Sequence, residues 1–272
     1  MTFDIGALRA PSGKHLRLDE IDPRSTPEWT GTDNEEGKAR VEELNARLEV
    51  LQELLYAEGK QRLLVVLQAM DAGGKDGTIR HVFDGVNPSG VRAPSFKKPS
   101  SKELAHDYLW RVHKEVPGDG EIVIFNRSHY EDVLVVRVLD LVPERRWRKR
   151  YDHIVDFERM LADEGTTIIK IYLHISKEEQ RERLQDRLDT PDKHWKFEPG
   201  DLDMRARWDD FMAAFEEAIE KTSTPHAPWF VIPADRKWYR NIAVLEILVQ
   251  TLENLNMHYP DAAPGLDQIT IE

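Results

Sequence analysis

Between residues 35 and 60, apolar positions recur regularly among charged ones. The spacings alternate between three and four, which places the apolar residues along one face of a helix. These residues are Val41, Leu44, Leu48, Leu51 and Leu55. The pattern predicts an amphipathic helix whose apolar face packs against the core of the protein.

Five short, largely apolar runs follow this helix and are rich in branched and aromatic residues. Runs of this kind are typical of strands buried on both faces of a parallel sheet. They cover residues 63–69, 91–96, 121–125, 167–175 and 229–233. Segments with helical periodicity separate them, so the chain is predicted to be an α/β protein with a five-stranded parallel sheet and helices on both faces.

Two of the helix starts carry a recognisable signal. Ser100 with Glu103, and Ser176 with Glu179, fit the capping box. In this motif a hydroxyl and a carboxylate bond the free N–H groups at a helix entrance. We therefore expect helices to begin after Ser100 and after Ser176.

Residues 189–201, DTPDKHWKFEPGD, break the alternation of strands and helices. The stretch contains two prolines and a glycine and has neither a helical nor a strand period. Loops of this length inside compact domains are usually functional, so we predict a mobile lid that ends at about residue 205. An ordinary surface loop is the alternative.

The length of 272 residues suffices for one large α/β domain, and we divide the chain into an N-terminal extension, 1–34, and a single domain, 35–272. The absence of cysteine excludes disulfides and thiolate catalysis. No signal-peptide pattern and no apolar stretch of about 18 residues is present, so we expect a cytoplasmic protein without a membrane span.

The net charge of −12 is unevenly distributed along the chain. Residues 61–150 carry 16 basic and 12 acidic side chains, whereas both flanking parts are acidic. An acidic body argues against nucleic acid as a partner, while a locally basic cleft suits a small or narrow polyanion. Charge on solvated helix surfaces is the alternative explanation.

Ligands of a parallel sheet bind beyond the carboxyl ends of its strands, which places the expected site after Ala69, Phe125 and Ile232. The sequence AMDAGGKDGT covers residues 69–78 and joins the first strand to a helix. Small residues let the backbone approach an anion, free N–H groups attract it, and a lysine can bridge two phosphates. The predicted phosphate-binding residues here are Ala72, Gly73, Gly74, Lys75, Asp76, Gly77 and Thr78. A glycine-rich turn that only ends the strand is the alternative.

This loop departs twice from the Walker A pattern, GxxxxGK[ST]. Ala69 replaces the first glycine, and Asp76 replaces the Ser or Thr that normally contacts magnesium. Asp71 lies inside the loop, where a carboxylate would repel phosphate unless a cation lay between them. Asp71 is therefore the first candidate ligand for Mg²⁺, for which Mn²⁺ is a possible substitute.

The third strand leads into the sequence FNRSHYE, from Phe125 to Glu131. A Walker B acid would stand at the position of Asn126, whose amide can contact the metal but brings no charge. Arg127 can hold the moving phosphoryl group, because its planar fork matches phosphate oxygens; a structural ion pair is the alternative. The predicted nucleotide-binding residues of this segment are Asn126, Ser128, Tyr130 and Glu131.

Further basic residues fall into two groups that we predict to line a phosphate track, with solvated surface charge as the alternative for each residue. The group near the first two strands comprises Arg80, Lys97 and Lys98. The group before and within the lid comprises Arg181, Arg183, Arg187, Lys193 and Lys196. Trp195 of the lid, and Asp235 and Lys237 after the last strand, are further candidates for nucleotide binding.

The motifs AMDAGGKDGT, FNRSHYE, and DKHWKF with RARWDDF occur in order between about residues 59 and 257, and together they resemble the polyphosphate kinase type 2 family. The resemblance implies a P-loop kinase-like three-layer sandwich with a lid. It also implies Mg²⁺, a polyphosphate donor, a nucleotide acceptor and a homo-oligomer, either a dimer or a tetramer.

The family resemblance further implies roles for individual residues. Asp71 matches the metal-binding and catalytic aspartate, and Lys75 the lysine of the phosphate loop. Arg127 and Arg187 match the arginines after the third strand and before the lid. Many members have Asp where this chain has Asn126, and FNRSHYE is similar to the branch that accepts both AMP and ADP.

The function expected from these features is reversible transfer of the terminal phosphoryl group of polyphosphate to AMP or ADP, with ATP as a product. Positioning and charge supply most of the catalysis in such a transfer. An ATP-dependent nucleoside monophosphate kinase is one alternative. A non-catalytic sensor of polyphosphate or nucleotide, built on the same fold, is another.

Overall fold

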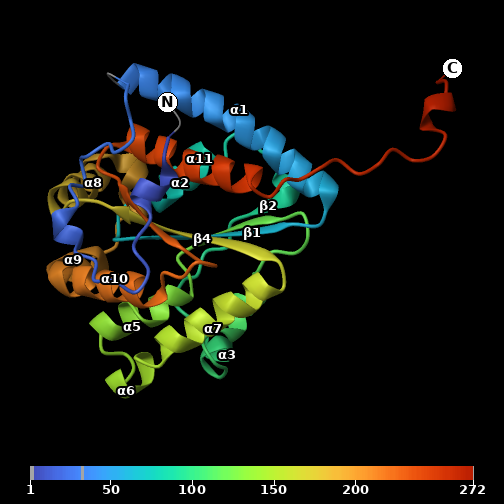
Figure 1. Ribbon diagram of the computed structural model, residues 1–272. Helices are drawn as coiled ribbons and strands as arrows, with labels where there is room; N and C mark the ends of the chain where they lie inside the picture. The colour runs from blue at the N-terminus through green and yellow to red at the C-terminus, as the bar shows by residue number, and fades with distance from the viewer. Residues whose placement is uncertain (1–2, 32–33, 272) are drawn as a thin grey trace.

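The computed structural model describes residues 3–31 and 34–271 and contains a five-stranded sheet in which every paired strand is parallel. The strand order is β2-β3-β1-β4-β5 (Figure 1). The strands are β1 (Arg62–Ala69), β2 (Val91–Arg92), β3 (Ile122–Asn126), β4 (Thr166–His174) and β5 (Trp229–Pro233). The prediction of a five-stranded parallel sheet is confirmed.

Strand β2 is much shorter than the predicted run of residues 91–96. After Arg92 the chain leaves the ladder and returns only as an isolated bridge between Ser95 and Asn126. Pro94 lies between Arg92 and Ser95 and has no N–H group to donate to a neighbouring strand. The proline therefore ends regular pairing that the apolar pattern alone would continue.

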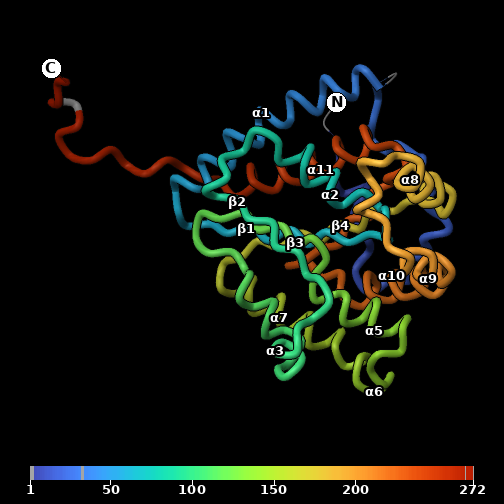
Figure 2. The backbone as a smooth tube through the Cα atoms, turned by 180° about the vertical axis from the view of Figure 1, so that it is seen from behind, coloured from blue at the N-terminus to red at the C-terminus, as the bar shows by residue number. Residues whose placement is uncertain are grey.

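Helices cover both faces of the sheet, as Figures 1 and 2 show from opposite sides. On one face lie α1 (Asn34–Glu58), α2 (Lys75–Val82) and α11 (Lys237–Glu253). On the other lie α5 (Val135–Val138), α7 (Arg150–Asp163) and α10 (Trp208–Thr222). The remaining α-helices are α3 (Ser101–Leu104), α4 (Trp110–His113), α6 (Glu144–Trp147), α8 (Lys177–Asp189) and α9 (Gly200–Ala206).

Short 3₁₀ helices complete the architecture. They are η1 (Ile5–Leu8), η2 (Leu18–Glu20), η3 (Pro88–Gly90), η4 (His129–Asp132), η5 (Pro191–Lys196) and η6 (Leu266–Gln268). The last of them lies in a C-terminal tail that runs away from the body (Figures 1 and 2). No helix within residues 3–31 and 34–271 has the length and apolar character needed to cross a bilayer.

Helix α1 begins and ends close to the predicted bounds and packs along α11. Leu44, Leu48 and Leu55 of its apolar stripe are at most 1 % exposed, and Val41 and Leu51 are partly buried. The periodicity of the sequence therefore identified the buried face of this helix correctly.

The two predicted capping boxes differ in the structure. At α3 both halves form, because Glu103 N donates to Ser100 Oγ (3.3 Å) and Ser100 N donates to Glu103 Oε2 (2.6 Å). At α8 only Ser176 Oγ accepts, from Glu179 N (3.0 Å). Ser176 N donates instead to Asp235 Oδ1 (2.8 Å), so the reciprocal half of this predicted box is wrong.

We expect Ser176→Ala to lower the free energy of unfolding by about 1 kcal/mol, because it removes the N-cap acceptor of α8. The hydroxyl also donates to Asp235 Oδ2 (2.8 Å), which the alanine cannot replace. Urea denaturation measures the change. Ser89→Ala, at an exposed serine, serves as the control and should stay within about 0.5 kcal/mol. An equal loss in both variants would contradict the assignment of the cap.

The N-terminal segment packs against the edge of the sheet rather than apart from it. Ala10 N donates to Trp229 O (2.8 Å), and Arg9 forms an antiparallel bridge with Phe230 of β5. Leu18 is 1 % exposed within the core. The segment therefore covers an edge strand that would otherwise present unpaired backbone groups. Residues 1–2 and 32–33 of the predicted extension 1–34 lie outside the described residues.

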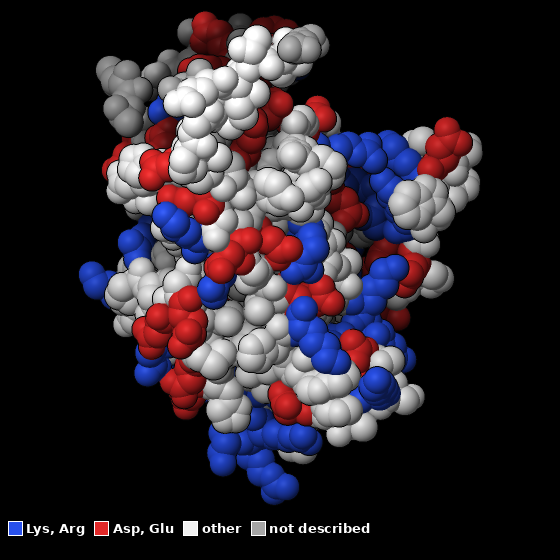
Figure 3. All heavy atoms as spheres, turned by 90° about the vertical axis from the view of Figure 1, so that its right-hand side faces the viewer, with Lys and Arg blue, Asp and Glu red and all other residues white. Residues whose placement is uncertain are grey.

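Surface charge is uneven, as the sequence predicts. On the face shown in Figure 3, Lys and Arg side chains gather along the right-hand edge and at the bottom, whereas acidic and basic side chains are mixed among uncharged residues in the middle and on the left. Part of the surface therefore carries a local positive field on a chain that is acidic as a whole.

Candidate active site

The loop between β1 and α2 has the conformation of an anion cradle. Ala72 and Gly74 have positive φ values of 59° and 98°, and Gly73 N donates to Met70 O (2.9 Å). A Cβ atom on Gly73 would lie 2.6 Å from the Met70 carbonyl oxygen, so only glycine fits there. Helix α2 begins at Lys75, and the N–H groups of its first turn have no helical acceptors. This predicted strand–loop–helix junction can therefore bind an anion through its backbone.

Lys75 is buried at the base of this loop. Its ammonium group donates hydrogen bonds to two backbone carbonyl oxygens, Ala69 O (3.0 Å) and Met70 O (3.4 Å). Burial lowers the pKa of Lys75, and the nearby charge of Asp71 opposes that effect. No carboxylate among the described residues forms an ion pair with it, so a bound phosphate would be its first close anionic partner.

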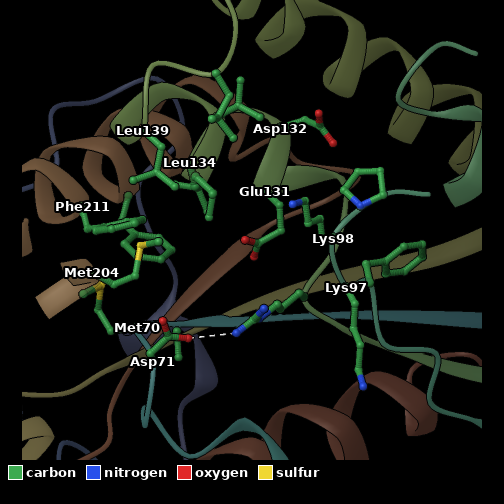
Figure 4. Close-up of a pocket in the computed structure, with 18 of the residues that line it drawn as sticks. Met70, Asp71, Lys97, Lys98, Glu131, Asp132, Leu134, Leu139, Met204 and Phe211 are labelled. Atoms are coloured by element: carbon green, nitrogen blue, oxygen red, sulfur yellow. Dashed lines mark hydrogen bonds and ion pairs between the residues drawn. The ribbon is translucent and has the colours of Figure 1, made fainter. Parts of the chain in front are cut away.

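Asp71 and Arg127 form an ion pair across the mouth of the loop, with Arg127 Nη2 donating to Asp71 Oδ1 (2.9 Å). Arg127 has a φ of 62°, a conformation that costs free energy for a residue with a side chain. In Figure 4 the carboxyl groups of Asp71 and Glu131 point toward the same space, and the dashed line marks the ion pair. The charges of Asp71, Arg127 and Glu131 thus converge on one cavity.

Glu131 is the second acid at this point. Burial raises its pKa, while the charges of Arg127 and Lys75 act in the opposite direction. A carboxyl group in such surroundings favours a nearby cation, because a cation offsets the free energy of desolvating the carboxylate. Its place beside the loop makes it part of the candidate site, as the FNRSHYE motif predicts.

A cavity of about 440 Å³ opens next to these charged groups. Its polar part contains Asp71, Arg127 and Glu131, together with Lys97 and Lys98 on one side (Figure 4). Its other part is apolar and is lined by Leu134, Val135, Leu139, Met204, Phe211 and Phe215. A volume and division of this kind fit a small molecule with an anionic end and a flat apolar end.

Several predicted residues support the loop without lining this cavity. Asn126 Nδ2 donates to Asp76 Oδ1 (2.7 Å), so the uncharged amide binds the aspartate that replaces the Walker A hydroxyl. Arg183 donates to Ala72 O (3.1 Å) and to Ala234 O (2.8 Å). Thr78 Oγ1 donates to Gly74 O (3.0 Å) inside α2. The contacts of Asn126 and Arg183 therefore tie the loop to β3 and to α8.

Tyr130 was predicted to bind nucleotide, and the structure contradicts this. Its side chain is 0 % exposed, and its hydroxyl donates to Glu158 Oε1 (2.9 Å) in the core. Ser128 is also fully buried, where it accepts from Gln68 Nε2 (3.1 Å) and from the backbone of the 3₁₀ turn. Both carboxylate oxygens of Asp235 accept hydrogen bonds from Ser176, at the N-terminus of α8. These three side chains therefore hold the fold together and present no free group to the cavity.

The predicted lid is more regular than its sequence indicates. Residues 191–196 form η5 and residues 200–206 form α9, so the expected absence of helix is wrong. Arg187 Nη1 ties the segment to α8 by donating to Lys196 O (3.0 Å) and Asp201 Oδ2 (3.2 Å). Trp195 is 78 % exposed, and Lys196 lies against its ring.

The other predicted basic residues do not line the cavity. Lys193 is paired with Asp186 (2.6 Å), and Arg181 pairs with Glu178 on the same helix. Arg80 and Lys237 are exposed. Of the predicted phosphate track, the structure brings only Lys97 and Lys98 to the cavity beside Arg127.

Sequence reasoning missed Gln180 and Arg240. Gln180 is fully buried, and its Nε2 donates to Asp71 O (2.9 Å), which fixes the backbone that carries the aspartate. Arg240 lies in the first turn of α11 against Gly74. Its position shortly after the last strand was the available signal, because that strand end was already expected to face the site.

The acidic side chains at the loop are few. No group of three or more His, Cys, Asp or Glu side chains suited to a metal occurs within residues 3–31 and 34–271. Mg²⁺ usually binds one or two protein carboxylates and takes its other ligands from water and substrate phosphates. Asp71 and Glu131, beside a phosphate loop, match that sparse protein contribution.

Fold and site together define an α/β protein with a phosphate-binding loop. The family model described as Polyphosphate kinase 2 matches residues 31–260. The AMP/ADP-polyphosphate phosphotransferase of Meiothermus ruber is 62 % identical over 266 residues, which cover 96 % of this chain and 97 % of that protein. The ADP-polyphosphate phosphotransferase of Rhodopseudomonas palustris is 46 % identical over 231 residues, 80 % of each chain.

A solved structure gives the same result. The crystal structure of polyphosphate kinase 2 from Arthrobacter aurescens TC1 superposes with a TM-score of 0.90 at 48 % identity, over 94 % of this chain and 91 % of that one. This chain belongs to the polyphosphate kinase 2 family, as its three motifs predicted.

Proposed function

We propose that this chain is a polyphosphate:AMP/ADP phosphotransferase. One observation carries the proposal: Asp71, Arg127 and Glu131 converge at the mouth of a phosphate loop, beside a cavity of nucleotide size. The near full-length relative at 62 % identity is named for transfer between polyphosphate and both AMP and ADP, which supports this choice of substrates.

The cavity of about 440 Å³ suits the acceptor nucleotide. Its apolar part, with Phe211 and Met204, offers flat contacts to a base. Its polar part, with Arg127 and Lys97, offers positive charge to the phosphates. This orientation brings the terminal phosphate of the acceptor to the mouth of the loop.

The transfer itself needs little beyond positioning and charge. A terminal oxygen of AMP or ADP forms a bond to the end phosphorus of polyphosphate as the adjacent donor anhydride bond breaks, and the shortened polyphosphate leaves. One anhydride replaces another, so the reaction runs in both directions. Lys75 and Arg127 offset the negative charge on the equatorial oxygens of a loose transition state.

Mg²⁺, with Mn²⁺ as a possible substitute, is the metal that this site suits. Asp71 would hold it, with Glu131 as the second carboxylate and Asn126 as an uncharged neighbour. When bound, the ion neutralises phosphate charge and orients the phosphates. The lid, residues 189–205, then serves to exclude water that would hydrolyse the donor, with Arg187 as its link to α8.

A direct assay tests the proposal. The protein is incubated with Mg²⁺ and AMP or ADP, with long-chain polyphosphate in one reaction and ATP in another, and new nucleoside di- and triphosphates are quantified by chromatography. We expect products with polyphosphate. Product with ATP alone would identify a nucleoside monophosphate kinase. Binding of both ligands without product in either reaction would identify a sensor.

A further inference from the structure

Arg240, in the first turn of α11, is a buried cation that pairs with no acidic side chain among the residues that the structure describes. It is 2 % exposed, and its contacts are with neutral groups. Nη2 donates to Asn241 Oδ1 (2.8 Å), and Nη1 reaches the Gly74 carbonyl oxygen at 3.5 Å. Within the part of the chain that the structure describes, the nearby charge that acts on it is that of Arg183, which is also positive.

Other buried cations of this protein are built differently. Arg150 has the Asp132 carboxylate at 2.8 Å, and Lys170 has Glu158 at 2.5 Å. Lys75 of the phosphate loop has only backbone carbonyls. Among the buried Lys and Arg side chains of residues 3–31 and 34–271, the two without an acid partner therefore both lie at the loop.

Burial of an unpaired charge lowers the stability of the folded state, and this effect persists at neutral pH because Arg240 stays charged. Burial, followed by the charge of Arg183, lowers the pKa of Arg240 to about 10. Because this value is still well above 7, the guanidinium remains protonated in the folded protein. A local cost of this kind is typical of a binding site, where the ligand supplies the missing charge.

Two guanidinium groups converge on one peptide of the loop. A Cβ atom on Gly74 would lie 2.4 Å from Arg240 Nη1 and 3.2 Å from Arg183 Nη1, so glycine is required for their approach. Arg183 is paired with Glu179 (2.7 Å), which leaves Arg240 as the uncompensated charge of the two. Arg240 is not part of the cavity lining assigned to the acceptor.

We propose that Arg240 is a positioning residue for the phosphate donor, which holds the loop peptide at Gly74 and supplies positive charge that bound polyphosphate neutralises. The proposal rests on the proposed function, since it assigns the loop to the donor and the cavity to the acceptor. Arg240 acts through the loop and does not itself touch the transferred phosphoryl group, because it is almost fully buried.

Three variants test this assignment: Arg240→Gln, Arg240→Lys, and Arg47→Gln as the matched control. Arg47 of α1 forms a surface ion pair with Glu253 of α11, the helix that contains Arg240. For each variant the KM values for polyphosphate and for AMP are measured separately, together with kcat. The melting temperature is measured without ligand and with inorganic tripolyphosphate.

For Arg240→Gln we expect the KM for polyphosphate to rise about tenfold or more, because the variant removes a positive charge that lies against the loop peptide. The KM for AMP should change less than about twofold, because Arg240 is absent from the cavity. The melting temperature without ligand should stay equal or rise, because an unpaired buried charge has been removed. Arg240→Lys should recover part of the affinity for polyphosphate, and Arg47→Gln should match the wild type.

Two results would overturn the assignment. A lower melting temperature of Arg240→Gln with an unchanged KM for polyphosphate would make Arg240 a purely structural residue. Equal increases in both KM values would remove the assignment to the donor.

The tripolyphosphate measurement separates this inference from the proposed function, because it needs no turnover. If tripolyphosphate stabilises the wild type but not Arg240→Gln, while the wild type forms no product from polyphosphate, the proposed function fails and Arg240 remains a phosphate-site residue. If tripolyphosphate stabilises both proteins equally, the role of Arg240 fails whatever the activity.

Discussion

Asp71→Asn should lower the rate of phosphoryl transfer from polyphosphate by about a thousandfold, the scale on which a single group that stabilises transition-state charge acts. Asparagine keeps the shape of the side chain but removes the charge that pairs with Arg127 (2.9 Å) and faces the phosphate loop. The variant therefore changes the electrostatics of the site with little change in packing. The initial rate at saturating Mg²⁺, polyphosphate and AMP measures the effect.

Asp84→Asn is the matched control. Asp84 is exposed just beyond α2, and its substitution removes one negative charge, as Asp71→Asn does. It should keep the wild-type rate within about twofold. The melting temperatures of both variants show whether each is folded. If Asp71→Asn turned over at the wild-type rate with saturating Mg²⁺, the role assigned to this carboxylate would be wrong.

Lys170→Met should lower the free energy of unfolding by about 3–5 kcal/mol, because it removes the lysine that pairs with the fully buried carboxylate of Glu158. Lys170 Nζ donates to Glu158 Oε2 (2.5 Å), Tyr130 Oη (2.9 Å) and Thr222 O (2.7 Å), and both charged side chains are 0 % exposed. The Lys170 charge holds the pKa of Glu158 below its usual range despite burial. Urea denaturation, followed by circular dichroism, measures the loss.

The double variant Lys170→Met/Glu158→Gln distinguishes a lost ion pair from a packing defect. Removal of both charges should recover more than half of the loss, because no unpaired charge is left in the core. Lys60→Met, at an exposed lysine, controls for the substitution itself. A double variant as unstable as Lys170→Met alone would show that packing, rather than the unpaired charge, sets the cost.

The sheet and the phosphate loop could be predicted because both depend on short, contiguous sequence signals. The apolar run before Ala69 and the glycines after it determine a strand, a turn and a helix within a few residues of one another. The two acidic residues of the loop, Asp71 and Asp76, were equally local signals. Their contacts, with Arg127 and with Asn126, follow from the adjacency of β1 and β3 in a parallel sheet.

The short helices of the predicted lid were missed because its prolines were treated as interruptions. Pro191 stands at the start of η5, and Pro199 is the residue before α9. At the first positions of a helix the missing N–H group of proline has no cost. The two prolines therefore begin helices here, although they suggested a loop without regular structure.

The surroundings of Tyr130 and Arg240 could not be predicted, because they depend on packing between distant parts of the chain. Tyr130 follows Arg127 closely in sequence, but the tight 3₁₀ turn of η4 directs it into the core, where Lys170 and Glu158 bind it. Arg240 meets Gly74 only because the start of α11 packs on the loop. Sequence alone shows neither the direction of the turn nor the missing acid partner.

We propose that the phosphoryl group passes from polyphosphate to the nucleotide at the loop that contains Asp71. Incubation of AMP with radiolabelled polyphosphate, in parallel for wild type and Asp71→Asn, tests this most directly when nucleotide products are separated and counted. We expect labelled ADP and ATP from the wild type and almost none from the variant. Unlabelled products, or equal labelling by both proteins, would contradict it.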